Sequence, residues 1–291
     1  AMTDGALGLN GSFDTAALNS IQRSGGSVTI AGTLDNTAAT VALGAGTALG
    51  TIELRPGGAV SGGAVKDAGG GFLFSGGVLR GVTYQGTLQM TQDNALVTVQ
   101  NGISFTGLNG AGAGTLLVTG NNAQFHTSGA ATLDNATVSL GNDTNWAYLI
   151  FDDNSAPTTV TLGSKLTINH TGRNVQVIGG GGNPSSVLAN QGLIAATLAG
   201  GSFNLSGQAF SNTGSIQVAN GDAFAINSIR FSNTGTVTIG SKSSLTLNSN
   251  WSNAGKIAMT DGALGLNGSF DTAALNSIQR SGGSVTIAGT L

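Results

Sequence analysis

Short alternations of apolar and polar residues fill the last third of the chain. Segments such as SIQV, TVTI and SLTL place an apolar side chain at every second position. This period of two is typical of a strand that buries one face. Long runs with the 3.6-residue period of a helix are missing from the sequence. The pattern therefore predicts an all-β protein built from many short strands.

The predicted strands recur at a regular interval. The segments LANQG, FSNTG, FSNTG and WSNAG each read apolar-x-Asn-x-Gly and follow one another at nearly equal spacing. This period is too short for a propeller blade or a helical repeat, but it fits one coil of a solenoid. We predict a right-handed parallel β-helix (a β-solenoid) with about 20–22 residues per coil. The predicted turn positions are Asn190, Gly192, Asn212, Gly214, Asn233, Gly235, Asn253 and Gly255.

Each Asn-x-Gly segment is interpreted as a corner between two strands, because glycine takes positive φ freely and asparagine tolerates it. Asparagines at equivalent corners of stacked coils can also hydrogen-bond to one another along the axis. One coil cannot bury its apolar face alone, so the alternate apolar residues should stack inside the solenoid. The predicted inward residues are Phe210, Ile216, Val218, Phe231, Val237, Ile239, Trp251 and Ile257.

One long segment occurs twice without any difference. The stretch from Ala1 to Leu34 returns at positions 258–291, so the sequence repeats after 257 positions (258 minus 1). We interpret residues 1–257 as one full tandem unit of a continuous solenoid and residues 258–291 as the start of the next. An overlap added at one end is the alternative. The chain begins as if in mid-strand, which indicates a window on a longer array.

A short helix is predicted within each copy of this segment. DTAALNSIQR, at 14–23 and again at 271–280, starts with an aspartate that can cap the helix. We expect it to lie at a coil corner and to cover an apolar edge.

Composition narrows the class of protein. Charged residues make up 8% of the chain, against about 25% in ordinary soluble domains, and 49 residues are glycine. No apolar run approaches the about 18 residues of a membrane helix. A net charge of −3 gives no basic surface for nucleic acid. The absence of cysteine removes disulfides and thiolate metal sites.

Few side chains offer chemistry. His126 and His170 stand in strand-like segments, and we interpret them as outward-facing because no orienting acid or nucleophile lies nearby in the sequence. Asp152 and Asp153 form the only adjacent carboxylate pair, whereas glycoside hydrolysis needs two spatially paired acids. Together with Asp143 they are weak calcium candidates. The sequence thus predicts no catalytic residue, no cofactor and no dedicated metal site.

The segments SIQRSGGSVTIAGTLDNTAATVAL and VLRGVTYQGTLQMT, followed by coils of the FSNTGTVTI type, resemble the β-strand-repeat proteins of bacterial surfaces. These are similar to filamentous-haemagglutinin-like and autotransporter-type adhesins. The resemblance covers essentially the whole chain. It implies a secreted, very long β-helical rod that serves in adhesion, a biofilm matrix or a surface fibre.

We therefore expect a structural repeat of an extracellular bacterial fibre or adhesin at the cell surface, and not an enzyme. The expected partners are identical units end to end, with lateral copies of the fibre or host and matrix glycans as further candidates. Nucleic acid and membrane insertion are not expected. Two alternatives stay open: a polysaccharide-binding or -degrading β-helix, and a self-assembling protein whose separate copies stack head to tail.

Overall fold

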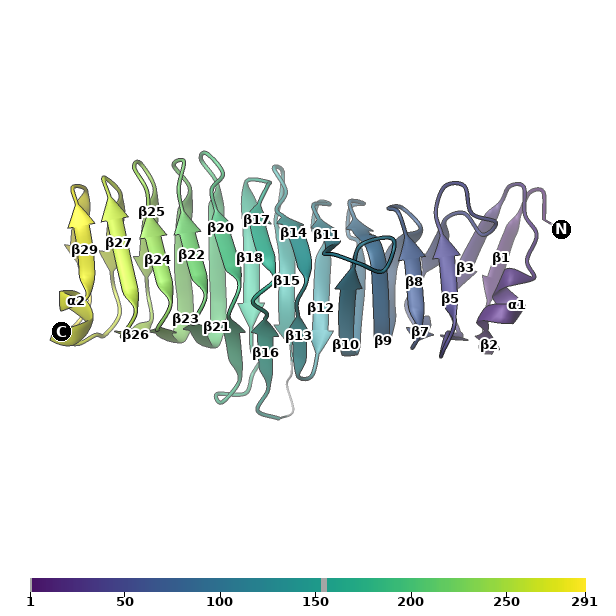
Figure 1. The fold of residues 1–291 in the computed structure, drawn as a ribbon, viewed down its shortest axis with the longest axis horizontal. Coiled ribbons are helices and arrows are strands. Elements are labelled where there is room, and N and C mark those ends of the chain that lie inside the picture. The colour runs from purple at the N-terminus through teal and green to yellow at the C-terminus, as the bar shows by residue number, and fades with distance from the viewer. Residues whose placement is uncertain (1, 153–155) are drawn as a thin grey trace.

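The chain folds into one rod of stacked β-coils. The structure is a computed structural model and describes residues 2–152 and 156–291. It contains about 13 turns with about 21 residues each, almost all of them parallel β-structure (Figure 1). The predicted all-β parallel solenoid is confirmed. Within the described residues, neither helix is long enough to cross a membrane.

The elements follow one another with short connections. The strands are β1 (Ala6–Leu9), β2 (Ser12–Asp14), β3 (Ser27–Ile30), β4 (Thr33–Asp35), β5 (Thr40–Leu43), β6 (Ile52–Leu54), β7 (Ala59–Ser61), β8 (Ala64–Asp67), β9 (Phe72–Met90), β10 (Leu96–Thr106), β11 (Gly114–Val118), β12 (Gln124–Ser128), β13 (Ala131–Leu133), β14 (Ala136–Leu140), β15 (Ala147–Asp152), β16 (Thr159–Leu162), β17 (Thr167–His170), β18 (Asn174–Gly179), β19 (Val187–Asn190), β20 (Leu193–Ala196), β21 (Ser202–Asn212), β22 (Ser215–Val218), β23 (Ala223–Asn233), β24 (Thr236–Ile239), β25 (Ser244–Leu247), β26 (Asn250–Asn253), β27 (Lys256–Thr260), β28 (Ala263–Leu266), β29 (Ile278–Ser281) and β30 (Ser284–Ile287). The helices are α1 (Thr15–Asn19) and α2 (Thr272–Asn276).

Parallel pairing between successive coils sets the period. In the C-terminal third, Ile216 pairs with Val237 and Val237 with Ile257, so these coils repeat with the predicted period. The middle coils are longer, since Leu149 pairs with Val177. The extra residues form loops, and the loop after β18 protrudes at the lower edge of Figure 1. The predicted coil length therefore holds for the regular coils and is too short for the middle ones.

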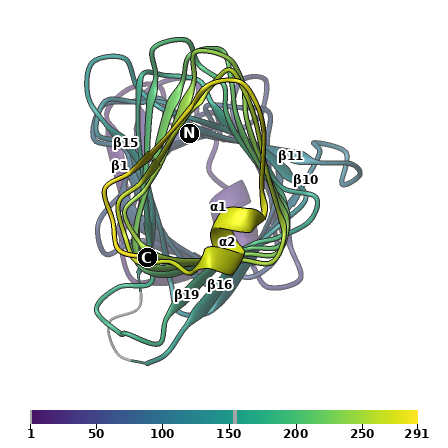
Figure 2. The ribbon, with the colours of Figure 1, turned by 90° about the vertical axis from the view of Figure 1, so that its left-hand side faces the viewer.

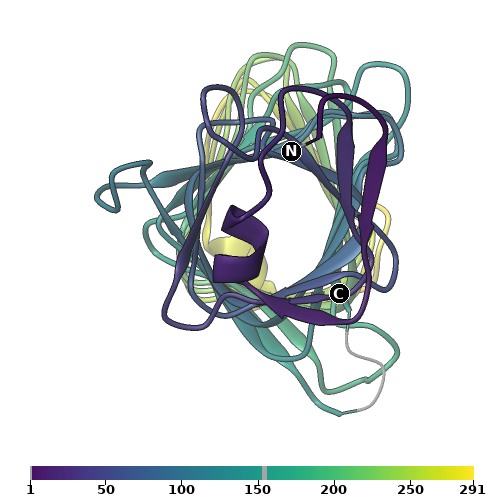
Figure 3. The ribbon, with the colours of Figure 1, turned by 90° about the vertical axis from the view of Figure 1, so that its right-hand side faces the viewer.

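The long strand β9 joins two sets of strand columns, a column being a stack of strands that pair with one another from coil to coil. On one side it pairs with β6, β7 and β8, and on the other with β10 and β11. The column of β1, β3 and β6 reaches its first residues, and the column that starts with β11 pairs with its last residues. The rod nevertheless continues without a break. Seen from its two ends, α1 and α2 lie at the same corner of the coil (Figures 2 and 3).

The core is a stack of inward-facing side chains. All eight inward residues predicted from the sequence are buried, none more than 4% exposed. Stacking in register brings like side chains together, and the rings of Phe210 and Phe231 are 5.5 Å apart and nearly parallel. Burying one such side chain contributes about 1.5–3 kcal/mol, so each added coil stabilises its neighbour.

Both helices begin at their predicted caps. The Asp14 carboxylate accepts a hydrogen bond from the Ala17 N–H at 2.7 Å, and Asp271 accepts one from the Ala274 N–H at 2.8 Å. The helices are shorter than the predicted spans 14–23 and 271–280. In the second copy the expected third turn is instead strand β29, which pairs with β27. Pairing with a neighbouring coil thus overrides the local helical pattern.

Candidate functional site

A ladder of asparagines runs along one corner of the C-terminal coils. The side-chain amide of Asn190 donates to Asn212 at 2.7 Å, Asn212 donates to Asn233 at 2.7 Å, and Asn233 donates to Asn253 at 2.6 Å. The first three side chains are buried. The ladder expected from the Asn-x-Gly period is therefore confirmed. Asn253 donates onward to the hydroxyl of Ser277, which follows α2.

The ladder starts abruptly. The coil before Asn190 places Leu162 at the equivalent position. The buried Oδ1 atom of Asn190 consequently has no hydrogen-bond partner in the described chain. Every amide from Asn190 to Asn233 donates to the asparagine of the following coil. An asparagine in the coil before Asn190 would therefore donate to the Oδ1 atom of Asn190.

The corner glycines are required for a different reason than the sequence suggested. Gly192, Gly214, Gly235 and Gly255 do not have φ in the left-handed region, so the expectation of positive φ was wrong for them. A Cβ atom on Gly235 would lie 2.2 Å from the carbonyl oxygen of Gly214 in the preceding coil. Close stacking of successive corners therefore demands glycine. Positive φ occurs at another corner, at Asn220, Lys242 and Asp261.

A second asparagine ladder lies on the outer surface and was not predicted. Asn227 donates to Asn204 at 2.6 Å, Asn248 donates to Asn227 at 2.5 Å, and Asn267 donates to Asn248 at 2.8 Å. The signal was present in the segments AINS, TLNS and GLNG, whose asparagines follow apolar residues that pair with one another in successive coils, while the asparagine of FNLS lies two positions earlier in the register. Two polar ladders thus hold these coils in register, one inside and one outside.

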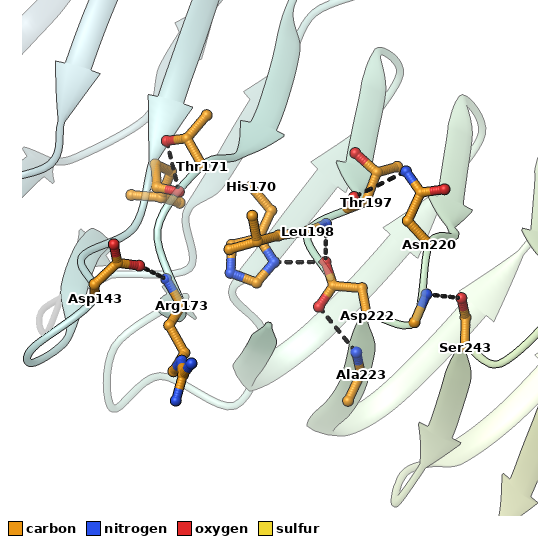
Figure 4. Close-up of polar contacts among 12 residues, drawn as sticks. Asp143, His170, Thr171, Arg173, Thr197, Leu198, Asn220, Asp222, Ala223 and Ser243 are labelled. Atoms are coloured by element: carbon orange, nitrogen blue, oxygen red, sulfur yellow. Dashed lines mark hydrogen bonds and ion pairs between the residues drawn. The ribbon is translucent and has the colours of Figure 1, made fainter. Parts of the chain in front are cut away.

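His170 corrects a sequence prediction, because it faces inward. Its Nδ1 atom lies 2.6 Å from Oδ2 of Asp222, and both side chains are fully buried (Figure 4). The N–H groups of Leu198 and Ala223 donate to the same carboxylate at 3.0 and 2.9 Å. Gly201 leaves the room that the pair needs, since a Cβ there would lie 2.4 Å from the imidazole. A pair sealed from solvent in this way is a structural element of the core.

His126 behaves as expected. It alternates with buried neighbours on β12, its side chain is on the outer face, and its ring nitrogen lies 3.1 Å from the Gln124 amide oxygen. The difference between the two histidines depends on which face of its strand each occupies. The acid that pairs with His170 is 52 residues away in the sequence, so no local sequence motif indicated the pair.

A second buried polar cluster lies near the N-terminal end. The Tyr84 hydroxyl donates to Asp67 at 2.6 Å, and the N–H groups of Gly69 and Gly71 donate to the same carboxylate at 2.7 and 3.0 Å. Burial, followed by the nearby charge of Asp67 and its hydrogen bond, raises the pKa of Tyr84 well above its usual value of 10.0. Both side chains are closed off from solvent.

Of the three calcium candidates, the structure describes the side chain of Asp143 alone. Asp143 accepts a hydrogen bond from the Arg173 N–H at 2.9 Å (Figure 4). Asp152 ends β15 but its side chain is not described, and Asp153 lies outside the described residues. No group of three or more His, Cys, Asp or Glu side chains in the described chain is placed to hold a metal ion.

A shallow groove of about 710 Å³ lies along β21, β23 and β26. Its described lining supplies one carboxylate, Asp271, and one guanidinium, Arg230, which donates to the Pro184 carbonyl at 2.5 Å. Serine and asparagine side chains supply the other polar atoms. Hydrolysis of a glycoside by two carboxylates would need a second acid beside Asp271.

The two copies of the repeated segment show what covers each side of a coil. Their internal pairing is the same: Ala6 pairs with Ser27 in the first copy and Ala263 with Ser284 in the second. Strand β6 covers the first copy on its C-terminal side, where Ile30 is 0% exposed; its equivalent, Ile287, is 54% exposed.

The opposite side shows the reverse. Strand β25 covers the second copy, and Leu266 is 0% exposed, whereas its equivalent, Leu9, is only partly buried. The two copies together therefore define both neighbours of the segment.

Comparisons with known proteins assign no family to this chain. No protein family matches this chain, and no curated protein matches it. Among solved structures the chain is similar to a TibC-catalysed, hyper-glycosylated fragment of TibA spanning residues 55–350, with 13% identity, a TM-score of 0.39, and coverage of 99% of this chain and 94% of that one. A TM-score this low leaves the function to be argued from the chain's own geometry.

Proposed function

We propose that this chain is a structural segment of a very long extracellular bacterial fibre or adhesin, in which it acts as a stiff β-helical rod. One observation carries the proposal. The two identical copies have the same internal pairing and the same orientation about the axis at opposite ends of one solenoid. Identical units can therefore follow one another without any new kind of contact.

The contacts of such a junction are those that the first copy already makes. In a chain that continues beyond residue 291, β30 would pair with the next unit's equivalent of β6, as β3 does here. Ile287 would then be buried like Ile30. Burial of one isoleucine contributes about 1.5–3 kcal/mol, and backbone hydrogen bonds add to it.

Length and stiffness are the properties that this architecture supplies. A unit of 257 residues at about 21 residues per turn holds about 12 coils, which at about 4.8 Å per coil is about 60 Å. Parallel pairing joins each coil to the next on every side, and the ladders fix the register. The resemblance of the sequence to bacterial surface proteins supports a place outside the cell, with identical units as the partners and no catalytic role.

Proteins with one, two and three consecutive units test this proposal. Small-angle scattering should show a constant cross-section and a length that grows by about 60 Å per unit, given the spacing of stacked strands. A matched control carries a flexible glycine-serine linker at the junction after residue 257. It should add the same mass but bend at the linker. Units that collapse side by side, or that bend equally with and without the linker, would contradict the rod.

The groove favours a second candidate, a polysaccharide-binding β-helix. Its exposed Arg230 and its serine and asparagine side chains suit hydrogen bonding to an acidic glycan. A glycan array probed with the chain, and with an Arg230→Ala variant, separates this candidate from a rod without a ligand. Binding that the variant loses would favour it; an empty array would refute it.

A further inference from the structure

The groove along β21, β23 and β26 runs parallel to the axis of the rod. Among the residues that line it, Val187 pairs with Ala209, and Ala209 pairs with Arg230. Arg230 pairs with Asn250, and Ser269 lines the groove in the coil that follows. The groove thus crosses four steps from coil to coil. At about 4.8 Å per step, its length is about 19 Å.

A row of serine hydroxyls lies along the floor of the groove. Ser211 pairs with Ser232, and Ser232 pairs with Ser252, so the three side chains leave the same face of the sheet one coil apart. In the part of the chain that the structure describes, none of these hydroxyls has a hydrogen-bond partner. The asparagines of the outer ladder, by contrast, use their amides to bond to one another. The floor therefore offers a row of hydroxyls that are available to a ligand.

The floor suits a sugar chain better than a peptide. β21 pairs with β19 and β23, and β23 also pairs with β26, so neither β21 nor β23 has a free edge. A peptide that binds by strand addition needs such an edge. A serine hydroxyl both donates and accepts hydrogen bonds, as the hydroxyls of a sugar do. A chain of sugars that lies along the row can therefore bond to each coil in turn.

Two charged side chains distinguish the middle of the groove from its end. The guanidinium of Arg230 is exposed on β23 and donates to the Pro184 carbonyl at 2.5 Å, which holds it in place. Its other N–H groups remain for a carboxylate. Asp271 lines the C-terminal end, where its carboxylate accepts from the Ala274 N–H. The groove therefore attracts an acidic sugar beside Arg230 and repels one beside Asp271.

We propose that this groove binds a linear polysaccharide whose acidic sugars are separated by neutral ones, with the sugar chain parallel to the axis of the rod. The inference rests on the glycan-binding candidate and names its ligand class. The carboxylate of one uronic acid pairs with Arg230, and neutral sugars extend over the floor serines toward Asp271. A polymer with a carboxylate on every sugar places one of them against Asp271 and binds more weakly.

Calorimetric titration of the 291-residue chain with three carbohydrates tests the proposal. Gellan fragments carry one uronate in each repeat of otherwise neutral sugars. Polygalacturonate fragments of the same length carry a uronate on every sugar, and cello-oligosaccharides carry none. The gellan fragments should bind most tightly, and each of the other two should bind several-fold more weakly.

Substitutions of the two charged residues should act in a ligand-dependent way. Arg230→Gln should weaken the binding of gellan fragments about tenfold, because a charge-assisted hydrogen bond is lost. It should leave the binding of cello-oligosaccharides unchanged. Asp271→Asn keeps a side-chain oxygen that can cap α2. It should strengthen the binding of polygalacturonate several-fold and change that of gellan fragments little.

A matched pair of serine variants tests the location. Ser232→Leu fills the middle of the floor and should abolish the binding of gellan fragments. Ser215→Leu places the same side chain at an exposed position of β22, a strand that does not line the groove, and should leave binding unchanged. Equal loss in the two variants would overturn the assignment to this groove.

The outcomes separate this inference from the functions on which it rests. Equal affinity for gellan and polygalacturonate fragments, with no gain from Asp271→Asn, would overturn the spacing of acidic sugars and leave glycan binding in place. Binding of none of the three carbohydrates would overturn both the inference and the glycan-binding candidate. Neither result affects the lengths of multi-unit chains in scattering, which test the rod separately.

Discussion

The inner ladder predicts that Asn212→Ala strongly destabilises the C-terminal coils. The Asn212 side chain is 0% exposed, accepts from Asn190 and donates to Asn233, both at 2.7 Å. Its removal leaves the Asn233 oxygen without that donor and leaves the Asn190 amide with two long contacts, at 3.3 and 3.4 Å, to carbonyl oxygens. A buried polar group without a partner costs about 1–3 kcal/mol. Two such groups make the expected loss about 2–6 kcal/mol.

The outer ladder supplies a matched control. Asn248 also bonds to asparagines on both sides, at 2.5 and 2.8 Å, but its side chain is exposed. Water replaces the lost partners at an exposed site, so Asn248→Ala should cost less than about 1 kcal/mol. Both residues are asparagines that bond to an asparagine in each neighbouring coil, and Asn212 is buried whereas Asn248 is exposed.

Urea unfolding and amide hydrogen exchange together measure the effect. Stacked coils can unfold in parts, so a single unfolding midpoint understates a local loss. Exchange rates in β22 and β24, which flank the ladder in successive coils, report the local free energy directly. Equal and small losses in the two variants would refute the claim that the buried ladder stabilises the stack.

Substitutions at three further sites, one of them with a matched control, test other contacts. Gly235→Ala should destabilise the rod by about 1–3 kcal/mol or more because its Cβ meets a backbone carbonyl of the preceding corner. Gly240→Ala, with no contact shorter than 3.5 Å, should be nearly neutral in urea unfolding. Asp222→Ala should cost about 3–5 kcal/mol in the same assay, since it leaves His170 buried without its partner. Because the pKa of Tyr84 is raised in the folded state, the unfolded chain loses that proton first and stability should fall as the pH rises above about 10; Tyr84→Phe should abolish this part of the alkaline loss in unfolding midpoints measured from pH 8 to 11.

The regular coils could be predicted because their period alone determines which residues of successive coils stack on one another. Once Asn212 and Asn233 are one coil apart, parallel pairing in register places them together, and the buried Phe210 and Phe231 follow from the same spacing. Sequence spacing and spatial neighbourhood coincide wherever coils have equal length. The ladder and the core of the C-terminal third could therefore be predicted from the sequence.

The buried polar pairs could not be predicted, because loops of unequal length interrupt the period. His170 and Asp222 are two coils apart, across segments whose lengths the pattern does not set. Asp67 and Tyr84 lie in β8 and β9, respectively, where the strand columns change. The corner glycines were correctly located, but their physical role required the distance between neighbouring coils.

The reactivity of one thiol tests the central claim, that identical units continue a single solenoid. An Ile287→Cys substitution introduces the only cysteine of the chain. In the 291-residue chain this position is 54% exposed, and its equivalent, Ile30, is 0% exposed. The thiol should react readily in this chain and at least about 100-fold more slowly in a chain with a second full unit, because buried thiols are unreactive. Equal reaction rates in the two proteins would contradict a continuous solenoid.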